Sequence, residues 1–234
     1  MRHLHIHILS VDPYDSYAYE IESADKYDNN YQYDGSINDA SLNLGGTTIK
    51  AANIFSAHSG SSNEILEAVS FSTGGANQTY KIDVYHNLAN AANPESGILV
   101  ASKEGSCDYS GYYTIELDNP VSIANGDTFS VVVTLTSLLS TSYAKISVEY
   151  PYQSVNYPTV ACTATAETGQ SYLYYNGSWE DFGVSDELNI CIKAFTNNAE
   201  QIAGIPASWP GSNLDIGSTG DKVRQMQEQL ARIS

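Results

Sequence analysis

The cysteines and histidines are the residues with which this chain could carry out nucleophilic catalysis. A thiol nucleophile needs an imidazole as its base, and in the Cys…His…Asn arrangement of thiol peptidases the cysteine comes first in the chain. Here all five histidines precede the first cysteine, so the run Gly105, Ser106, Cys107 has no histidine downstream of it. The sequence therefore excludes thiol-peptidase chemistry, although this run looks like a nucleophile motif.

The three cysteines, Cys107, Cys162 and Cys191, do not have the spacing of a zinc site. One disulfide could form at most, and a bridge between Cys162 and Cys191 is compatible with the sequence if their strands are neighbours. Because one cysteine would be left over in any case, we expect free thiols. The cysteines therefore do not distinguish an oxidising from a reducing compartment.

Three histidines at the N-terminus, His3, His5 and His7, would share one face of a strand and could grip a metal ion. Bound histidines are normally oriented by a second hydrogen-bond partner, and the sequence offers no such partner for them. We therefore expect no metal at this segment.

Oxygen-bearing side chains are concentrated in the N-terminal arm, where eight acidic residues lie between Asp12 and Asp39 against a single lysine. Calcium prefers such oxygen ligands, although the arm lacks the spacing of a recognised calcium loop. We expect a solvated acidic connector, with calcium near Asp25, Asp28 and Asp34 as the alternative. The residues that could bind it are Asp25, Asp28, Asn29, Asn30 and Asp34.

A sugar site is predicted where Asn176 and Gly177 form a two-residue hairpin turn, because this dipeptide strongly favours such turns. The turn fixes the register of its strands, so Tyr174 lies opposite Trp179 on the same side of the sheet. If Leu173 points to the core, the aromatic side chains around the turn point outward.

The predicted platform consists of Tyr172, Tyr174 and Trp179, with Glu180 and Asp181 beside it. Flat aromatic rings suit stacking on the C–H face of a pyranose, and the carboxylates could accept hydroxyl protons. The alternative is that Trp179 points inward and caps the core, as tryptophans of such domains commonly do. Paired carboxylates could also support glycoside hydrolysis, which the 27 acidic residues leave open as a further alternative.

The elements that must position these residues are short alternating runs separated by turn residues. This pattern predicts an all-β fold, a two-sheet antiparallel β-sandwich of jelly-roll type, with inward residues such as Val69, Phe71, Ile82, Val131 and Ile192. Their neighbours are expected to point outward, for example Asp83 and Glu149. The eight predicted strands are 52–55, 65–72, 79–86, 111–117, 128–135, 144–150, 171–175 and 189–195.

Composition limits the partners of this 234-residue chain. Its formal net charge of −17 argues against nucleic acid and anionic membranes, which both require a basic surface. No run of about 18 apolar residues is present, and residues 1–9 are too polar for a signal peptide, so we expect any export signal upstream. Eighteen tyrosines with few basic residues are typical of secreted β-sandwich modules, which favours an extracellular setting.

A helix is predicted at the C-terminus, where Ser218 and Asp221 form a capping box. The following apolar residues recur at helical spacing, with nothing after them to cover their stripe. The segment resembles the first third of the three-helix peptidoglycan-binding module of bacterial cell-wall proteins, the alternative being an ordinary docked helix. The matching residues are Leu214, Gly217, Gly220, Val223, Gln227 and Leu230.

Four segments of the main domain resemble the lectin-like domain that follows papain-like cysteine peptidases in Gram-positive anaerobic bacteria. They are residues 27–35 (YDNNYQYDG), 51–56 (AANIFS), 67–71 (EAVSF) and 111–117 (GYYTIEL). Alternation is lost after Phe195, which indicates a linker before the C-terminal helix. The two resemblances and this linker predict four parts: a peptidase remnant with an acidic connector (1–26), the lectin-like sandwich (27–198), the linker (199–208) and the truncated peptidoglycan-binding helix (209–234).

This resemblance implies a non-catalytic module of a secreted or surface peptidase whose catalytic residues are absent here. Its partners would be a glycan or cell-wall polymer and the peptidase domain of the same polypeptide. The competing interpretation is a structural spacer that packs on that peptidase domain, for which an exposed apolar patch would be the sign.

Overall fold

The structure of the protein is a computed structural model that describes most of the predicted sandwich. The described residues are 6–7, 18–19, 23, 25–35, 40–58, 63–153, 161–162, 164–185 and 187–199. The chain divides into two compact units, Met1–Asn198 and Ala199–Ser234. Within the described ranges, no helix has the length and apolar character needed to cross a bilayer. The predicted C-terminal helix lies outside them.

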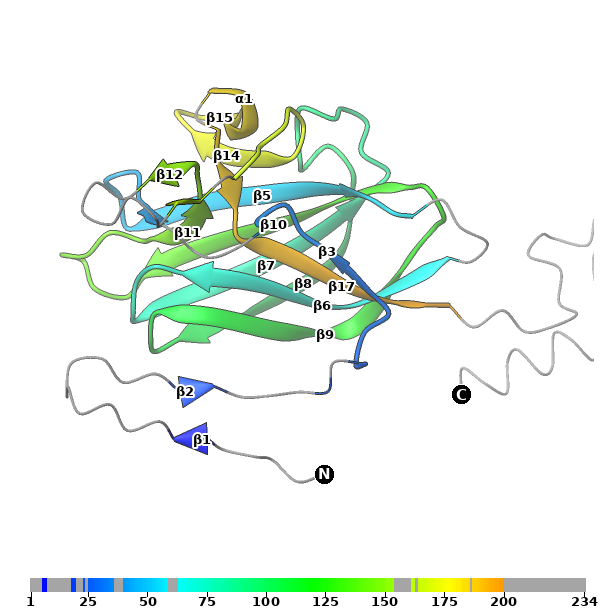
Figure 1. Cartoon of the computed structure of the whole chain (residues 1–234), viewed down its shortest axis with the longest axis horizontal. Helices are drawn as coiled ribbons and strands as arrows, with labels where there is room; N and C mark the ends of the chain where they lie inside the picture. Colours follow the sequence, from blue (N-terminus) through cyan, green and yellow to red (C-terminus); the bar gives the residue numbers. More distant parts are fainter. Residues whose placement is uncertain are drawn as a thin grey trace, which may run out of the picture. The chain divides into compact units, whose positions relative to one another are not determined.

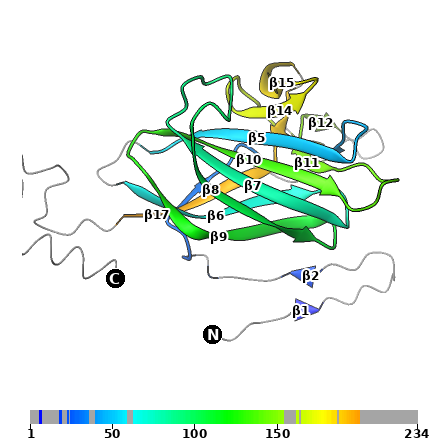
Figure 2. The ribbon, with the colours of Figure 1, turned by 180° about the vertical axis from the view of Figure 1, so that it is seen from behind.

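Two antiparallel sheets face each other and form the sandwich, which confirms the predicted fold class. Figure 1 looks onto the sheet that contains β17 and β3, and Figure 2 looks onto the other sheet. The first sheet has the order β15 (Ser178–Asp181), β14 (Ser171–Tyr175), β5 (Thr48–Ser56), β10 (Thr128–Ser137), β7 (Gln78–His86) and β8 (Ile98–Cys107). The second has the order β16 (Asn189–Ile190), β11 (Ile146–Glu149), β6 (Glu64–Thr73), β17 (Ile192–Asn198) and β3 (Asn29–Tyr31), with β4 (Ala40–Leu42) on β11 and β9 (Gly111–Ile123) on β6.

Small elements complete the described chain. The strands β1 (Ile6–His7) and β2 (Ala18–Tyr19) pair with each other, as do β12 (Tyr152–Gln153) and β13 (Ala161–Cys162). The helix α1 (Phe182–Ser185) directly follows β15.

The core lies between the two sheets and is filled by the residues that alternation predicts. Val69, Phe71 and Ile192 come from the second sheet, and Ile82 and Val131 come from the first; all five are fully buried. Burial of such a side chain stabilises the fold by about 1.5–3 kcal/mol, so the inward residues account for the pairing of the sheets.

All eight predicted stretches lie in strands, although residues 189–195 are divided between β16 and β17. The sequence missed the short strands β3 and β4 and the ten-residue strand β8. This strand forms the edge of the first sheet, and Ile98 and Leu99 at its start are exposed. An edge strand buries little of either face, so its sequence lacks a clear alternation of apolar and polar residues. The strand predicted at residues 111–117 also continues to Ile123, through Pro120.

Two side chains predicted to point into solvent are buried. Asp83 and Glu149 do lie on outer faces of their sheets, yet each is less than 5% exposed. Asp83 pairs with Lys81 at 2.7 Å and accepts a hydrogen bond from Ser102. Glu149 accepts a hydrogen bond from the backbone N–H of Gly35. The prediction failed because alternation along one strand cannot indicate which side chains and backbone groups of other segments surround an outward residue.

Candidate functional site

The hairpin of β14 and β15 has the predicted register. Tyr174 pairs with Trp179, and Tyr175 pairs with Ser178. Asn176 and Gly177 have φ angles of 51° and 88°, the left-handed values that a two-residue hairpin turn requires. Leu173 is fully buried in the core, so the neighbouring side chains face away from the core as predicted.

The predicted platform of three open rings is wrong, because Tyr172 is only 3% exposed. Its ring packs with Ala52, Ile54 and Val132 in a small cluster on the outer face of the first sheet. Its hydroxyl donates a hydrogen bond to the backbone oxygen of Ala91, at 2.9 Å. The loop between β7 and β8 therefore covers the ring, which is not available to a ligand.

Trp179 fits neither of the two alternatives, since it faces outward but is partly buried against the same cluster. Its indole N–H donates to Glu95 Oε2 at 3.1 Å, and Lys50 Nζ bonds Glu95 Oε1 at 2.5 Å. The Lys50 ammonium lies 5.0 Å from the ring centre of Tyr174 and 5.2 Å from that of Trp179. We call Lys50, Glu95, Tyr172, Tyr174 and Trp179 the hairpin surface.

The two predicted carboxylates beside this surface differ. Glu180 is exposed to solvent. Asp181 accepts hydrogen bonds from the backbone N–H groups of Gly169, at 2.7 Å, and Gly183, at 3.1 Å. Asp181 therefore holds the chain around α1, and a role of either residue in binding a ligand stays a prediction.

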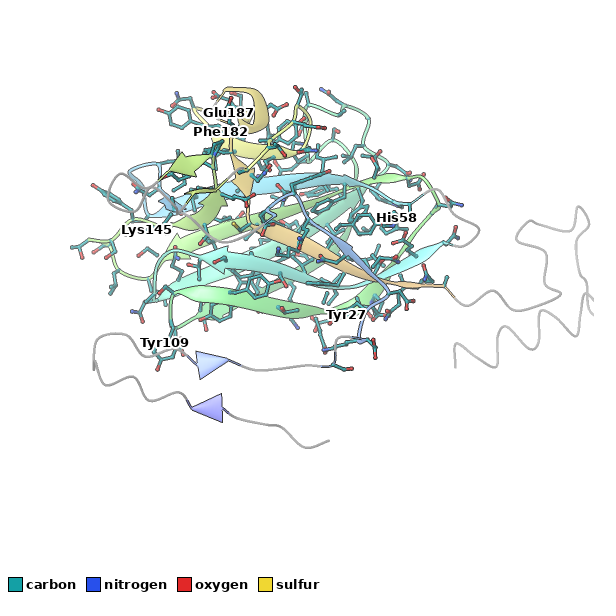
Figure 3. All side chains as sticks on the ribbon, viewed as in Figure 1. Tyr27, His58, Tyr109, Lys145, Phe182 and Glu187 are labelled. Atoms are coloured by element: carbon teal, nitrogen blue, oxygen red, sulfur yellow. The ribbon has the colours of Figure 1, made fainter. Side chains whose placement is uncertain are left out.

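An open hollow lies on the outer face of the second sheet, where sequence reasoning placed no glycan site, although three of the residues considered for calcium, Asp28, Asn29 and Asn30, line it. Its volume is about 360 Å³. We call it the Tyr27 hollow; Figure 3 labels Tyr27 beside the start of β3. Its lining residues are Ser23, Lys26, Tyr27, Asp28, Asn29, Asn30, Tyr112, Thr114 and Phe195.

Aromatic rings form the apolar part of the Tyr27 hollow. Tyr27 and Phe195 stack with ring centres 5.0 Å apart and an interplanar angle of 27°. Tyr112, which projects from β9, is 52% exposed. Such exposure of a large aromatic side chain is informative because it leaves apolar surface available to a partner.

Amides and a carboxylate form the polar part of the hollow. The side-chain amide of Asn29 donates to Thr196 Oγ1 at 3.1 Å and to Asn198 Oδ1 at 3.2 Å. These bonds fix the orientation of Asn29 at the edge of β17. Asp28 accepts a hydrogen bond from the backbone N–H of Asn198 at 2.8 Å and is exposed to solvent.

A second hollow of about 240 Å³ adjoins the first, because both are lined by Lys26 and Tyr27. We call it the Glu67 extension. Lys26 pairs with Glu116 at 2.7 Å, and this contact lowers the pKa of the Glu116 carboxyl. The other lining residues are Glu67, Leu117 and Asn197.

Only a weak signal for these hollows is present in the sequence. Residues 27–35 carry the family resemblance, but nothing local shows that Tyr27 meets Phe195. That contact depends on the pairing of β3 with β17, in which Asn29 lies opposite Thr196. Pairing between distant segments cannot be read from the sequence of either strand alone.

The predicted calcium residues do not form one cluster. Among the described residues, no group of three or more histidine, cysteine or acidic side chains could hold a metal ion. Asp34 pairs with Lys193 at 2.6 Å, and burial raises the pKa of its carboxyl. Its second oxygen and Oδ1 of Asn189 are buried with no hydrogen-bond partner in the described part of the chain. Calcium near Asp34 stays a prediction, with these two oxygens as its best support.

Cys107 is a buried thiol outside any disulfide, and burial raises its pKa to about 11. A thiol of such high pKa is not a nucleophile at neutral pH. The bridge considered between Cys162 and Cys191 stays a prediction, because the side chain of Cys162 lies outside the described residues. Two further predictions stay predictions, because the side chains concerned lie outside the described residues. They are the metal-binding alternative at His3, His5 and His7 and the peptidoglycan-module residues Leu214, Gly217, Gly220, Val223, Gln227 and Leu230.

Comparison with known proteins gives one family and several structural neighbours, two of which are cysteine-protease structures. A family model described as a lectin-like domain matches residues 30–196. The clostridial cysteine protease Cwp84 after propeptide cleavage is 24% identical, with a TM-score of 0.59 over 73% of this chain and 40% of that chain.

A second structure holds the cysteine protease and lectin-like domains of Cwp84, a surface-layer-associated protein of Clostridium difficile. It is 24% identical, with a TM-score of 0.53 over 65% of this chain and 33% of that one. The chain thus spans less than half the length of these neighbours, and at this identity the likeness concerns the fold. No curated protein matches the chain.

Proposed function

Because the chain belongs to the family of lectin-like domains, we propose that it is a non-catalytic module that binds a glycan or cell-wall polymer in the Tyr27 hollow. The parent protein would be a secreted or surface cysteine peptidase, in line with the structural neighbours that join such a domain to a protease. The sandwich of this chain would bind the polymer, and the peptidase domain of the parent protein would act on its own substrate.

The observation that carries the proposal is the combination of open aromatic surface and oriented amides in one hollow. Tyr112 is half exposed, and the stacked pair of Tyr27 and Phe195 lies within the same lining. A volume of about 360 Å³ is within the range of small-ligand sites. A pyranose could place its C–H face on a ring and its hydroxyls against Asn29 and Asn30.

Glycoside hydrolysis is a weaker interpretation of the same hollow. A hydrolase needs one carboxylic acid with a raised pKa beside a second carboxylate. The pKa of Glu116, at the edge of the Glu67 extension, is lowered by Lys26. Asp34, whose pKa burial raises, is not a lining residue of either hollow.

The proposal is tested by co-sedimentation of the whole chain with insoluble peptidoglycan and with a panel of insoluble plant and mucin polysaccharides. We expect Tyr112→Ala to weaken binding about fivefold, since one aromatic contact is worth about 1 kcal/mol. Tyr174→Ala, on the hairpin surface, is the matched control and should bind as the wild type does. Lack of binding to every polymer, or loss with Tyr174→Ala alone, would contradict the proposal.

A structural spacer is the second candidate, because apolar side chains are exposed at the end of the sandwich away from Tyr27. Leu138, Leu139 and Tyr143 in the β10–β11 loop are each about half exposed, and Tyr109 in the β8–β9 turn is 78% exposed. Figure 3 shows Tyr109 and Tyr27 toward opposite ends of the sandwich. Such a surface could pack on a peptidase domain of the same polypeptide. This contact would leave the Tyr27 hollow open, so the two candidates are compatible.

A further inference from the structure

The strand β6 contains a β-bulge at Glu67, next to the Tyr27 hollow. Opposite β17, Ala68 pairs with Phe195 and Leu66 pairs with Thr196, so Glu67 has no partner residue. The register opposite β9 shifts at the same place. An extra residue of this kind re-aims a side chain and is common beside functional sites.

The bulge has a clear effect on the face to which Glu67 belongs. Leu66 and Val69 both point into the core, so two residues stand between them where alternation allows one. Glu67 is half buried and lines the extension, together with Lys26, Tyr27 and Asn197. Among the described residues, no hydrogen bond or ion pair engages its carboxylate.

The charges around the Glu67 extension are unbalanced. Lys26 is the one basic residue among the linings of the two hollows, and it already pairs with Glu116. Asp28 and Glu67 add negative charge to the same surface, on a chain with a formal net charge of −17. An anionic ligand would be repelled here, and a cationic group would find a carboxylate without a competing partner.

We propose that Glu67 is the specificity-determining residue of this site, and that it selects glycans bearing a protonated amine over anionic glycans. The inference rests on the proposed function. A sugar ring stacked in the Tyr27 hollow would place its neighbour along the polymer over the Glu67 extension, with the amine facing the carboxylate. An exposed ion pair contributes little, so we expect the amine to strengthen binding about twofold to fivefold over a neutral ring.

The test is calorimetric titration of the whole chain with three oligosaccharides of equal length, at low salt and at a pH that keeps the amine protonated. The probes are oligomers of glucosamine, N-acetylglucosamine and galacturonic acid. The wild type should bind the amine form tightest and the anionic form weakest, and added salt should reduce the difference. Glu67→Gln should bind the amine and neutral forms equally, whereas Glu104→Gln, an exposed carboxylate on β8, should keep the wild-type order.

The outcomes separate this inference from the proposed function. If the neutral oligomer binds but Glu67→Gln leaves the order unchanged, the inference is overturned and the binding function stands. Equal binding of the anionic oligomer by the wild type would also overturn it. If none of the three binds, the proposed function fails, and the inference fails with it.

Discussion

The hairpin surface and the Tyr27 hollow are built from the same kinds of side chain on opposite sheets, yet the chain buries Tyr172 and partly buries Trp179 in the first, leaving Tyr174 exposed, whereas the second borders an open space. At the hairpin, Lys50 covers the rings of Tyr174 and Trp179, and Glu95 binds both Lys50 and the indole. In the hollow, Tyr27 and Phe195 stack against each other and border a space of about 360 Å³.

This difference teaches that aromatic composition does not identify a binding surface. A cation over an aromatic ring is a contact that a ligand could supply, but Lys50 already supplies it to Tyr174 and Trp179, and Lys26 supplies it to Tyr27 at 5.3 Å. The half-exposed Tyr112 is therefore the ring of the hollow that a ligand could cover. The partners that the chain provides for its own rings decide which surface is left for a ligand.

The largest effect should come from Tyr172, the buried member of the hairpin surface. We expect Tyr172→Ala to lower the free energy of unfolding by about 3 kcal/mol, because it removes a packed ring. Glycan binding should be unchanged in the folded protein. Thermal unfolding by circular dichroism checks this, with exposed Tyr175→Ala as the control; a variant as stable as the wild type would mean that the loop does not hold Tyr172.

Removal of calcium tests whether the stability of the second sheet depends on an ion near Asp34. If calcium binds there, an excess of 100 times its dissociation constant should stabilise the fold by about 2.7 kcal/mol over the chelated protein. Asp34→Asn should remove this difference, whereas Asp25→Asn should keep it. Identical melting curves of the wild type with calcium and with chelator would dismiss the prediction.

Glu95 links the components of the hairpin surface, so its removal should open that surface. Glu95→Gln keeps the size of the side chain but loses the ion pair with Lys50, which we expect to cost about 1 kcal/mol. The fluorescence of Trp179 should shift to the red as solvent reaches the indole; a Trp209→Phe background removes the second tryptophan. An unchanged spectrum would show that Glu95 does not keep this surface closed.

The sequence predicted the parts of the fold that depend on local patterns. Alternation located eight strands and the core, and Asn176 with Gly177 fixed the register of a hairpin. Burial of Tyr172 was missed because the covering residue, Ala91, is 81 positions away. The hollow was missed for the same reason, since Asn29 and Thr196 are separated by 167 positions.

Mapping of a bound oligosaccharide by nuclear magnetic resonance tests the central claim most directly. The polymer that co-sediments best would supply a soluble fragment for titration into the ¹⁵N-labelled chain. Binding in the Tyr27 hollow predicts that the amide signals of Tyr27, Asn29 and Tyr112 move, while those of Tyr174 and Glu180 stay in place. Shifts confined to Tyr174 and Glu180 would contradict the account and return the site to the hairpin.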